Sequence, residues 1–268
     1  MCRPVSVVVP LVPAHDRYLE SLVEQLKSDA EVIDKVVLAR SSARSGHVSV
    51  LANMAEELSN THGMTIELLP TSRARLAGQN RNRGWERVTS PYTAFLDADD
   101  RYAPYRLQRL LEVAEDRASD LVLHDFITGI DDSIGFPDAS WTGKDLIGTE
   151  SLYLATFPEG RQRWKEGSVP GDTNVVVPFD ASTPRGVHHG HIFVKTSLRR
   201  EFSFGSLYPG EDGQFCRDVL WSKRSVTYVP ARLSIYRSQL SAESESDFFR
   251  RRRRDLSSLA RRLGVNAN

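Results

Sequence analysis

Short runs of β-branched and aliphatic residues alternate with helical patterns along the first half of the chain. The runs predict strands at residues 5–10, 36–39, 65–69, 92–96 and 121–123. Between them, apolar residues recur at helical spacing over residues 18–28, 48–58, 79–88 and 105–118. Strands that alternate with helices form a mainly parallel sheet with helices on both faces. The pattern therefore predicts an α/β fold.

The pattern is less regular from about residue 127 onward. Residues 131–186 are rich in Gly, Pro, Asp and Thr, and so long an irregular stretch in a compact domain is usually functional or mobile. Regularity returns with a predicted strand at 192–194, a helix at 213–221 and a strand at 226–229. A separate basic helix is predicted at 247–263.

Ligands of parallel sheets bind outside the carboxyl ends of the strands. The residues after Pro10, Ala39 and Leu96 all lie at such ends. We therefore expect these three segments to face one crevice.

Composition excludes several classes of function. Lys plus Arg and Asp plus Glu number 35 each, so the charge gives no reason to expect nucleic acid as a partner. Cys2 and Cys216 are the only cysteines, which is too few for a disulfide scaffold or a structural zinc cluster. The apolar run 5–9 is too short for a membrane span or a signal sequence. A cytoplasmic protein is expected.

An acidic cluster, Asp97, Asp99 and Asp100, follows the predicted strand 92–96. Two carboxylates one residue apart across a turn can converge on one hard cation, Mg²⁺ or Mn²⁺. A cation held in this way neutralises a departing diphosphate. Alternatively, Asp99 or Asp100 caps the helix that follows. The loop alone leaves both interpretations open.

Five motifs along the chain, in their order and rough spacing, resemble glycosyltransferase family 2. They are Val5–Pro10, Gly78–Gly84, Tyr92–Asp100, Gly210–Phe215 with Arg217, and Tyr236-Arg237. The resemblance implies a GT-A fold and transfer of a sugar from a nucleoside diphosphate sugar, with UDP-sugars favoured. It implies a catalytic domain over residues 1–237. In that domain residues 1–126 bind the nucleotide sugar and residues 127–237 form the acceptor side.

On the donor side, the resemblance implies a role for each matching residue. Asp99 coordinates Mn²⁺ or Mg²⁺, and Asp97 lies near the nucleotide ribose or the metal. Arg81 reaches the donor nucleotide or its phosphates. Pro10 and Ala98 complete the donor site.

On the acceptor side, the resemblance makes Asp212 the general base of an inverting transfer, with Glu211 beside it. Such a reaction needs a carboxylate that is separated from the cation on the leaving group. The alternative for Asp212 is a cap of the helix 213–221. His189 is expected to contact substrate, the alternatives being a solvated loop histidine or a zinc ligand. The acceptor is open: a glycan, a lipid-linked sugar, a protein or a small molecule.

The chain departs from the family at two places. Relatives carry acids after the second strand that bind the nucleobase, whereas this chain has Ala39-Arg40-Ser41-Ser42. Arg40 or Arg44 then meets phosphate or is a surface charge. Gln239 stands where many relatives have a metal-binding histidine, and an amide oxygen is a weaker ligand.

The tail, residues 238–268, contains five consecutive arginines, Arg250–Arg254. We expect its leucines to pack on the domain while the arginines stay in water. Peripheral membrane contact and formation of a homo-oligomer are the alternatives.

Two other functions fit the same fold. A nucleotidyltransferase that makes sugar nucleotides needs a Gly-rich loop after the first strand, and residues 10–15 contain no glycine. A binding protein that has lost activity is the other, and the two departures from the family favour it.

Overall fold

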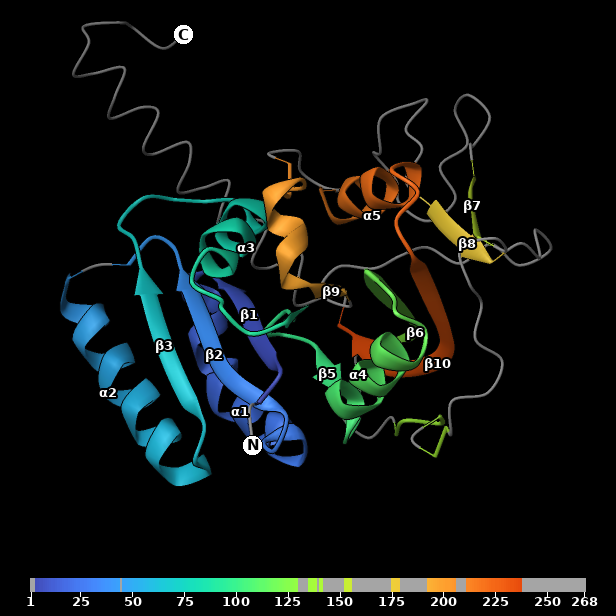
Figure 1. Cartoon of the computed structure of the whole chain (residues 1–268). Helices are drawn as coiled ribbons and strands as arrows, with labels where there is room; N and C mark the ends of the chain where they lie inside the picture. The colour runs from blue at the N-terminus through green and yellow to red at the C-terminus, as the bar shows by residue number, and fades with distance from the viewer. Residues whose placement is uncertain are drawn as a thin grey trace, which may run out of the picture.

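A mainly parallel sheet of eight strands runs through the described part of the chain (Figure 1). The computed structural model describes residues 3–43, 45–129, 135–138, 140–141, 152–155, 175–178, 192–205 and 211–237. The strands are β1 (Val5–Leu11), β2 (Ile33–Arg40), β3 (Thr65–Pro70), β4 (Tyr92–Phe95), β5 (Arg101–Tyr102), β6 (Leu121–Thr128), β9 (Phe193–Lys195) and β10 (Val226–Tyr236). Their order across the sheet is β3-β2-β1-β4-β9-β6-β10-β5.

Strand directions place most of the carboxyl ends at one edge of the sheet. β3, β2, β1 and β4 are parallel neighbours, as are β6 and β10. β9 lies antiparallel between β4 and β6, so the two parallel groups point the same way. The expected mainly parallel α/β fold is confirmed, and the segments that follow β1, β2 and β4 lie at the same edge.

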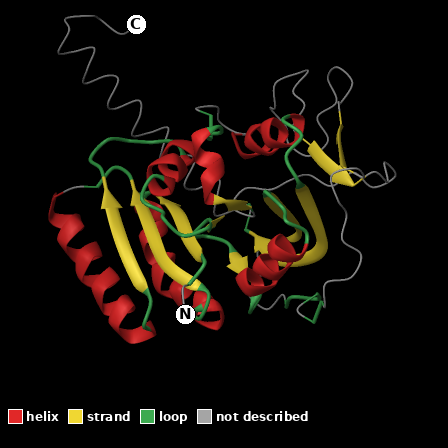
Figure 2. Ribbon diagram, viewed as in Figure 1, coloured by secondary structure: helices red, strands yellow, loops and turns green. Residues whose placement is uncertain are grey.

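Helices cover both faces of the sheet (Figure 2). α1 (Leu19–Leu26), α2 (Ser45–His62) and α4 (Arg106–Asp116) bury their apolar sides in one core. α3 (Ala77–Trp85) and α5 (Glu211–Trp221) pack into a second core on the opposite face, around Trp85, Phe204 and Phe215. Three short 3-10 helices, η1 (Pro13–Tyr18), η2 (Lys27–Asp29) and η4 (Thr196–Arg200), complete the described helices.

The structure extends or corrects several sequence-based boundaries. β10 continues through Pro230, where the pairing with β6 shifts register between Val229 and Arg232; an irregularity of this kind tolerates proline. The stretch 131–186, expected to be irregular, contains a small antiparallel sheet of β7 (Leu152–Ala155) and β8 (Val175–Pro178). The predicted basic helix at 247–263 lies outside the described residues. No helix in the described ranges is long and apolar enough to cross a membrane.

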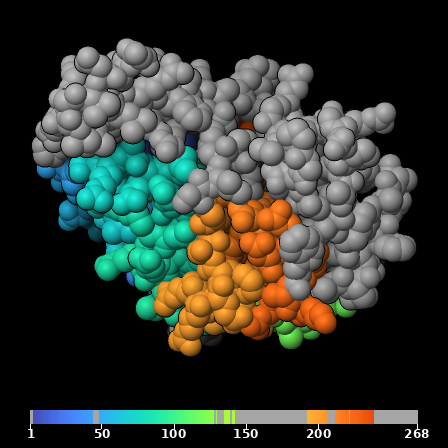
Figure 3. Space-filling view, turned by 90° about the horizontal axis from the view of Figure 1, so that it is seen from above, coloured from blue at the N-terminus to red at the C-terminus, as the bar shows by residue number. Residues whose placement is uncertain are grey.

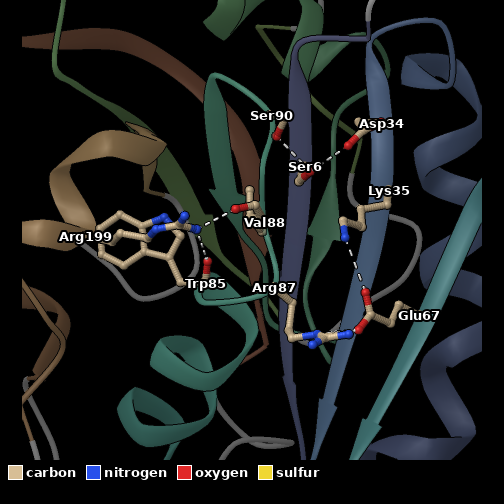
Figure 4. A network of polar contacts seen from close by, with 9 residues as sticks. All are labelled: Ser6, Asp34, Lys35, Glu67, Trp85, Arg87, Val88, Ser90 and Arg199. Atoms are coloured by element: carbon tan, nitrogen blue, oxygen red, sulfur yellow. Dashed lines mark hydrogen bonds and ion pairs between the residues drawn. The ribbon is translucent and has the colours of Figure 1, made fainter.

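Polar contacts fix the end of α3 against the sheet (Figure 4). Arg199 donates hydrogen bonds to the carbonyl oxygens of Trp85, at 2.9 Å, and of Val88. Arg87 binds Glu67 of β3 at 2.7 Å, and Lys35 of β2 binds the same carboxylate at 3.3 Å. These contacts hold the end of α3 in place, one helical turn after Arg81.

Gly84 lies where α3 crosses β1, and a side chain at this position has no room. A Cβ atom there would lie 2.4 Å from Cγ1 of Val8. We expect Gly84→Ala to lower the free energy of unfolding by about 1–3 kcal/mol, because overpacking outweighs the better helix propensity of alanine. Urea unfolding measures it. Gly135→Ala is the control, since no atom lies within 4 Å of its added Cβ; equal stability of the two variants would contradict the expectation.

Candidate functional site

The acidic cluster forms a turn between β4 and β5 that is held from both sides. The Asp97 N–H donates to the Tyr102 hydroxyl at 2.7 Å, and this hydroxyl donates to the Asp97 carbonyl at 2.8 Å. Asp100 accepts a 3.0 Å hydrogen bond from the backbone N–H of Arg237. The turn is thus fixed by β5 and by the end of β10, and its three carboxylates lie at the carboxyl edge of the sheet.

The capping interpretation of Asp99 and Asp100 is wrong. The chain enters β5 after Asp100, and α4 begins only at Arg106. A carboxylate from another element, Asp29 of η2, accepts the hydrogen bond from the first-turn N–H of Gln108 at 3.0 Å. The acids of the turn therefore do not cap α4.

Arg81 of α3 joins two acids that are far apart in the sequence. One terminal nitrogen donates to both carboxylate oxygens of Asp97, at 2.9 and 3.1 Å. The other donates to Glu211, the first residue of α5, at 2.8 Å. The guanidinium is buried, so these bonds are shielded from water. Arg81 thereby connects the turn after β4 to the start of α5.

The surroundings of Arg81 favour its charge. Burial alone would lower the pKa of this guanidinium, but the charges of Asp97, Glu211 and Asp212 outweigh burial and raise the pKa. Asp212 is itself buried, directly after Glu211 at the start of α5, and its charge is one of those that raise the pKa of Arg81. Glu211, which is predicted for the acceptor side, and Asp97, which is predicted for the donor side, are therefore held by the same guanidinium.

Close packing of α3 on the segment before α5 makes this arrangement possible. Asn82 exchanges two hydrogen bonds with the backbone of Phe204, each 2.9 Å long. A Cβ at Gly78 would lie 2.7 Å from the carbonyl oxygen of Gly205 and 2.9 Å from Cγ of Glu211. Figure 3 shows the two parts of the chain side by side on the surface. Glycine at position 78 thus allows α3 to approach Glu211.

A buried layer beneath the turn supports Tyr102. The Arg106 guanidinium lies over the Tyr102 ring, 4.9 Å from its centroid, and donates through Nε to Nε2 of His124 at 2.9 Å. Burial and the Arg106 charge lower the pKa of His124 well below its usual value, so the imidazole is neutral. Its Nδ1–H then donates to the Asp125 carbonyl at 2.7 Å. Burial also lowers the pKa of Arg106 to about 10.

Asp100 has a strongly perturbed pKa. Burial raises its pKa well above the usual value, and the charges of Asp99 and Asp97 raise it further. A carboxyl group in this position favours the protonated form, or a cation close by. Asp97, Asp99 and Asp100 thus bring three interacting carboxyl groups together in one short turn.

The 3-10 helix η1, which follows β1, carries two polar residues that sequence reasoning did not assign to the site. Asp16 accepts hydrogen bonds from Nε and Nη2 of Arg40, at 2.7 and 2.8 Å. Arg40 is buried at the end of β2, so its interpretation as a surface charge is wrong. Asp16 thus places a carboxylate at the carboxyl edge of the sheet, where the end of β2 carries no acid.

His15, the other residue, lies beside the acidic turn. Its Nε2 is 3.8 Å from Oδ2 of Asp99. Both ring nitrogens are buried, and neither has a hydrogen-bond partner among the residues that the structure describes. A histidine placed soon after the first strand, at the carboxyl edge, was the signal available in the sequence.

The side chains at the turn fit a donor-associated divalent cation. Within the described ranges, no three His, Cys, Asp or Glu side chains form a metal cluster. However, Mg²⁺ and similar cations are commonly held by one or two protein ligands together with substrate phosphates and water. Arg81 engages both oxygens of Asp97, whereas Oδ2 of Asp99 lies 3.8 Å from Nε2 of His15. Asp99 is the residue of the turn that would hold such a cation.

The remaining predicted residues divide between the site and the undescribed segments. Pro10 lies in β1 near its carboxyl end and pairs with Ala39, and Ala98 is buried within the turn. His189, Gln239 and Arg44 lie outside the described residues. Their expected roles stay predictions.

Comparison with known proteins identifies the family. The profile described as glycosyl transferase family 2 matches residues 6–181, which is more than half of the chain. No curated protein sequence matches the chain.

Solved structures share the fold. The fragment 1–349 of S. aureus TarS in complex with UDP-GlcNAc superposes with a TM-score of 0.55 at 13% identity, covering 87% of this chain and 58% of that one. The mannosyltransferase PcManGT from Pyrobaculum calidifontis, in complex with GDP-Man and Mn²⁺, gives 0.56 at 14% identity and covers 87% and 56%. The chain thus spans little more than half of each of these two solved chains, the first of which is itself a fragment, and it shares their GT-A architecture.

Proposed function

The chain belongs to glycosyl transferase family 2, and on this premise we propose that it transfers a sugar from a nucleoside diphosphate sugar to an acceptor. One observation carries the proposal. Arg81 binds Asp97, at the end of β4, and Glu211, at the start of α5. A transferase needs its donor groups and its base at one place, and this ion-pair bridge supplies that proximity.

We assign the donor side to the turn after β4. Asp99 holds a divalent cation, Mn²⁺ or Mg²⁺, which when bound neutralises charge on the leaving diphosphate. Asp97, fixed by Arg81, borders the same position. Arg81 itself stabilises the carboxylates rather than reaching far into the donor, because both terminal nitrogens are already engaged.

We assign proton transfer to Asp212. Asp212 is buried in the first turn of α5, directly after Glu211, which is bound to Arg81, and it is the base that accepts the proton of the acceptor hydroxyl. Direct attack by this hydroxyl on the side opposite the leaving group inverts the anomeric centre. Glu211 acts as the anchor that fixes the first turn of α5, and thereby Asp212.

UDP-sugars are the donors we favour, with GDP-sugars next. The acceptor is proposed to bind on the side formed by residues 127–237, in a protein that works in the cytoplasm. The tail, residues 238–268, is proposed to pack on the domain or to contact a membrane surface or a second copy of the chain. No nucleic-acid partner is expected.

A donor screen tests the proposed function. The intact chain is incubated with a panel of UDP-, GDP- and other nucleotide sugars, with and without Mn²⁺, and the released nucleotide is measured. We expect release with one nucleotide class, dependent on metal. Asp99→Ala should lower the release at least a hundredfold, on the order of the loss of one transition-state stabiliser.

Other outcomes of this screen favour the alternatives. Formation of a sugar nucleotide from a nucleoside triphosphate and a sugar phosphate would show a nucleotidyltransferase. Calorimetric binding of nucleotide sugars without any turnover would show a binding protein that has lost activity. Normal release by Asp99→Ala would contradict the assigned site.

A further inference from the structure

His15 occupies a position that packing alone does not explain. Its side chain is 13% exposed, yet both ring nitrogens are buried without a hydrogen-bond partner in the described part of the structure. A buried polar atom that makes no hydrogen bond costs about 1–3 kcal/mol. Such atoms are rare enough in native proteins to need a specific reason, and an absent ion is one of the usual reasons.

The distance between His15 and Asp99 suits a bridging cation better than a direct bond. At 3.8 Å, Nε2 and Oδ2 are too far apart for a hydrogen bond. Two atoms that each lie about 2.1 Å from one cation are separated by roughly 3–4 Å, depending on the angle between them. The gap in the structure falls within this range.

The neighbourhood supplies the charge for such an ion. Asp99 and Asp100 are both buried at this turn. The positively charged guanidinium of Arg81 is bonded to Asp97 and Glu211. A divalent cation between Asp99 and His15 would therefore neutralise the part of the turn that Arg81 does not reach.

We propose that His15 is a nitrogen ligand of the divalent cation at Asp99 and makes this site selective for manganese over magnesium. Imidazole binds transition metals, whereas Mg²⁺ prefers oxygen ligands and gives up its water reluctantly. The ligand comes from the segment after the first strand. The inference deepens the proposed function by naming the metal choice of the same site, and it is tested without turnover.

The first experiment measures metal binding by the intact chain. Mn²⁺ affinity is followed by electron paramagnetic resonance of the free ion, and Mg²⁺ affinity by competition. His15→Ala is expected to weaken Mn²⁺ binding at least tenfold and Mg²⁺ binding much less, so the ratio of the two affinities falls. Asp99→Ala should weaken both, because it removes the shared carboxylate.

His62→Ala is the matched control. His62 lies 3.7 Å from an oxygen of Glu24, a geometry similar to that of His15 and Asp99. However, it ends α2 at the opposite edge of the sheet, and the Glu24 side chain is 60% exposed. This variant should bind Mn²⁺ like the wild type. An unchanged Mn²⁺ affinity in His15→Ala would overturn the proposal.

A second measurement needs no variant to fold. Mn²⁺ broadens the nuclear magnetic resonance signals of nearby atoms, and the imidazole of His15 should be broadened before that of His62 in the wild-type chain. Equal broadening of the two would also overturn the proposal. Both results are separate from the donor screen: the metal site can be present when no sugar is transferred, and transfer can occur when His15 binds no metal.

Discussion

Asp212→Asn should lower kcat by about 10²–10⁴, the usual contribution of a general base, and leave donor affinity unchanged. Asparagine keeps the size of the side chain but cannot accept the proton of the acceptor hydroxyl. The donor groups lie on the turn after β4, and Glu211 rather than Asp212 holds the Arg81 bridge. The loss should therefore appear in turnover and not in donor binding.

The measurement is initial-rate kinetics with the donor found in the screen, together with calorimetric titration of that donor. Asp218→Asn is the matched control, because it makes the same change on the same helix at a side chain that is 42% exposed. This control should keep full activity. A kcat within about threefold of the wild type in Asp212→Asn, far less than the range expected for a base, would assign proton transfer to another group.

Arg81→Gln should have the largest effect on stability, a loss of about 3–5 kcal/mol. Breaking a buried ion pair by removing one partner leaves an uncompensated buried charge. Here two carboxylates, Asp97 and Glu211, lose their partner at once. Because the same bridge connects the donor turn to α5, the variant should also lose transfer activity.

Urea unfolding measures this loss, and Arg87→Gln is the control. Arg87 also binds a carboxylate, that of Glu67, but its side chain is 56% exposed, so its removal should cost about 0–1 kcal/mol. Adding Glu211→Gln to Arg81→Gln should recover part of the stability, since the second change removes a charge that the first left unpaired. Additive losses would argue against a coupled bridge.

Much of the fold could be predicted from the sequence because its signals are local. The β-branched run of β1 and the apolar spacing of α1 are sufficient to predict those elements. The direction of β9 was not predictable in the same way. A run of three apolar residues, as at 192–194, has the same pattern in a parallel or an antiparallel strand, and the neighbours of β9, which are β4 and β6, are fixed by tertiary packing.

The site was predictable in its residues but not in its contacts. The acids after β4 and at the start of α5 stand in motifs, so their positions could be identified. The bond between Arg81 and Glu211 spans 130 positions, and nothing local to either residue indicates it. His15 and Asp16 lie in no motif. Their importance follows only from the carboxylate and the guanidinium that the fold places beside them.

The antiparallel strand β9 also bears on how the chain folds. It pairs with both β4 and β6, although it follows β4 by almost a hundred residues (193 − 95 = 98). Until β9 has been synthesised, the growing chain exposes the unpaired edge of β4. Strands of other molecules can pair with such an edge. Such long-range pairing slows folding. The part of the sheet formed by β1 to β4 is thus joined to β6 and β10 only when β9 has been made.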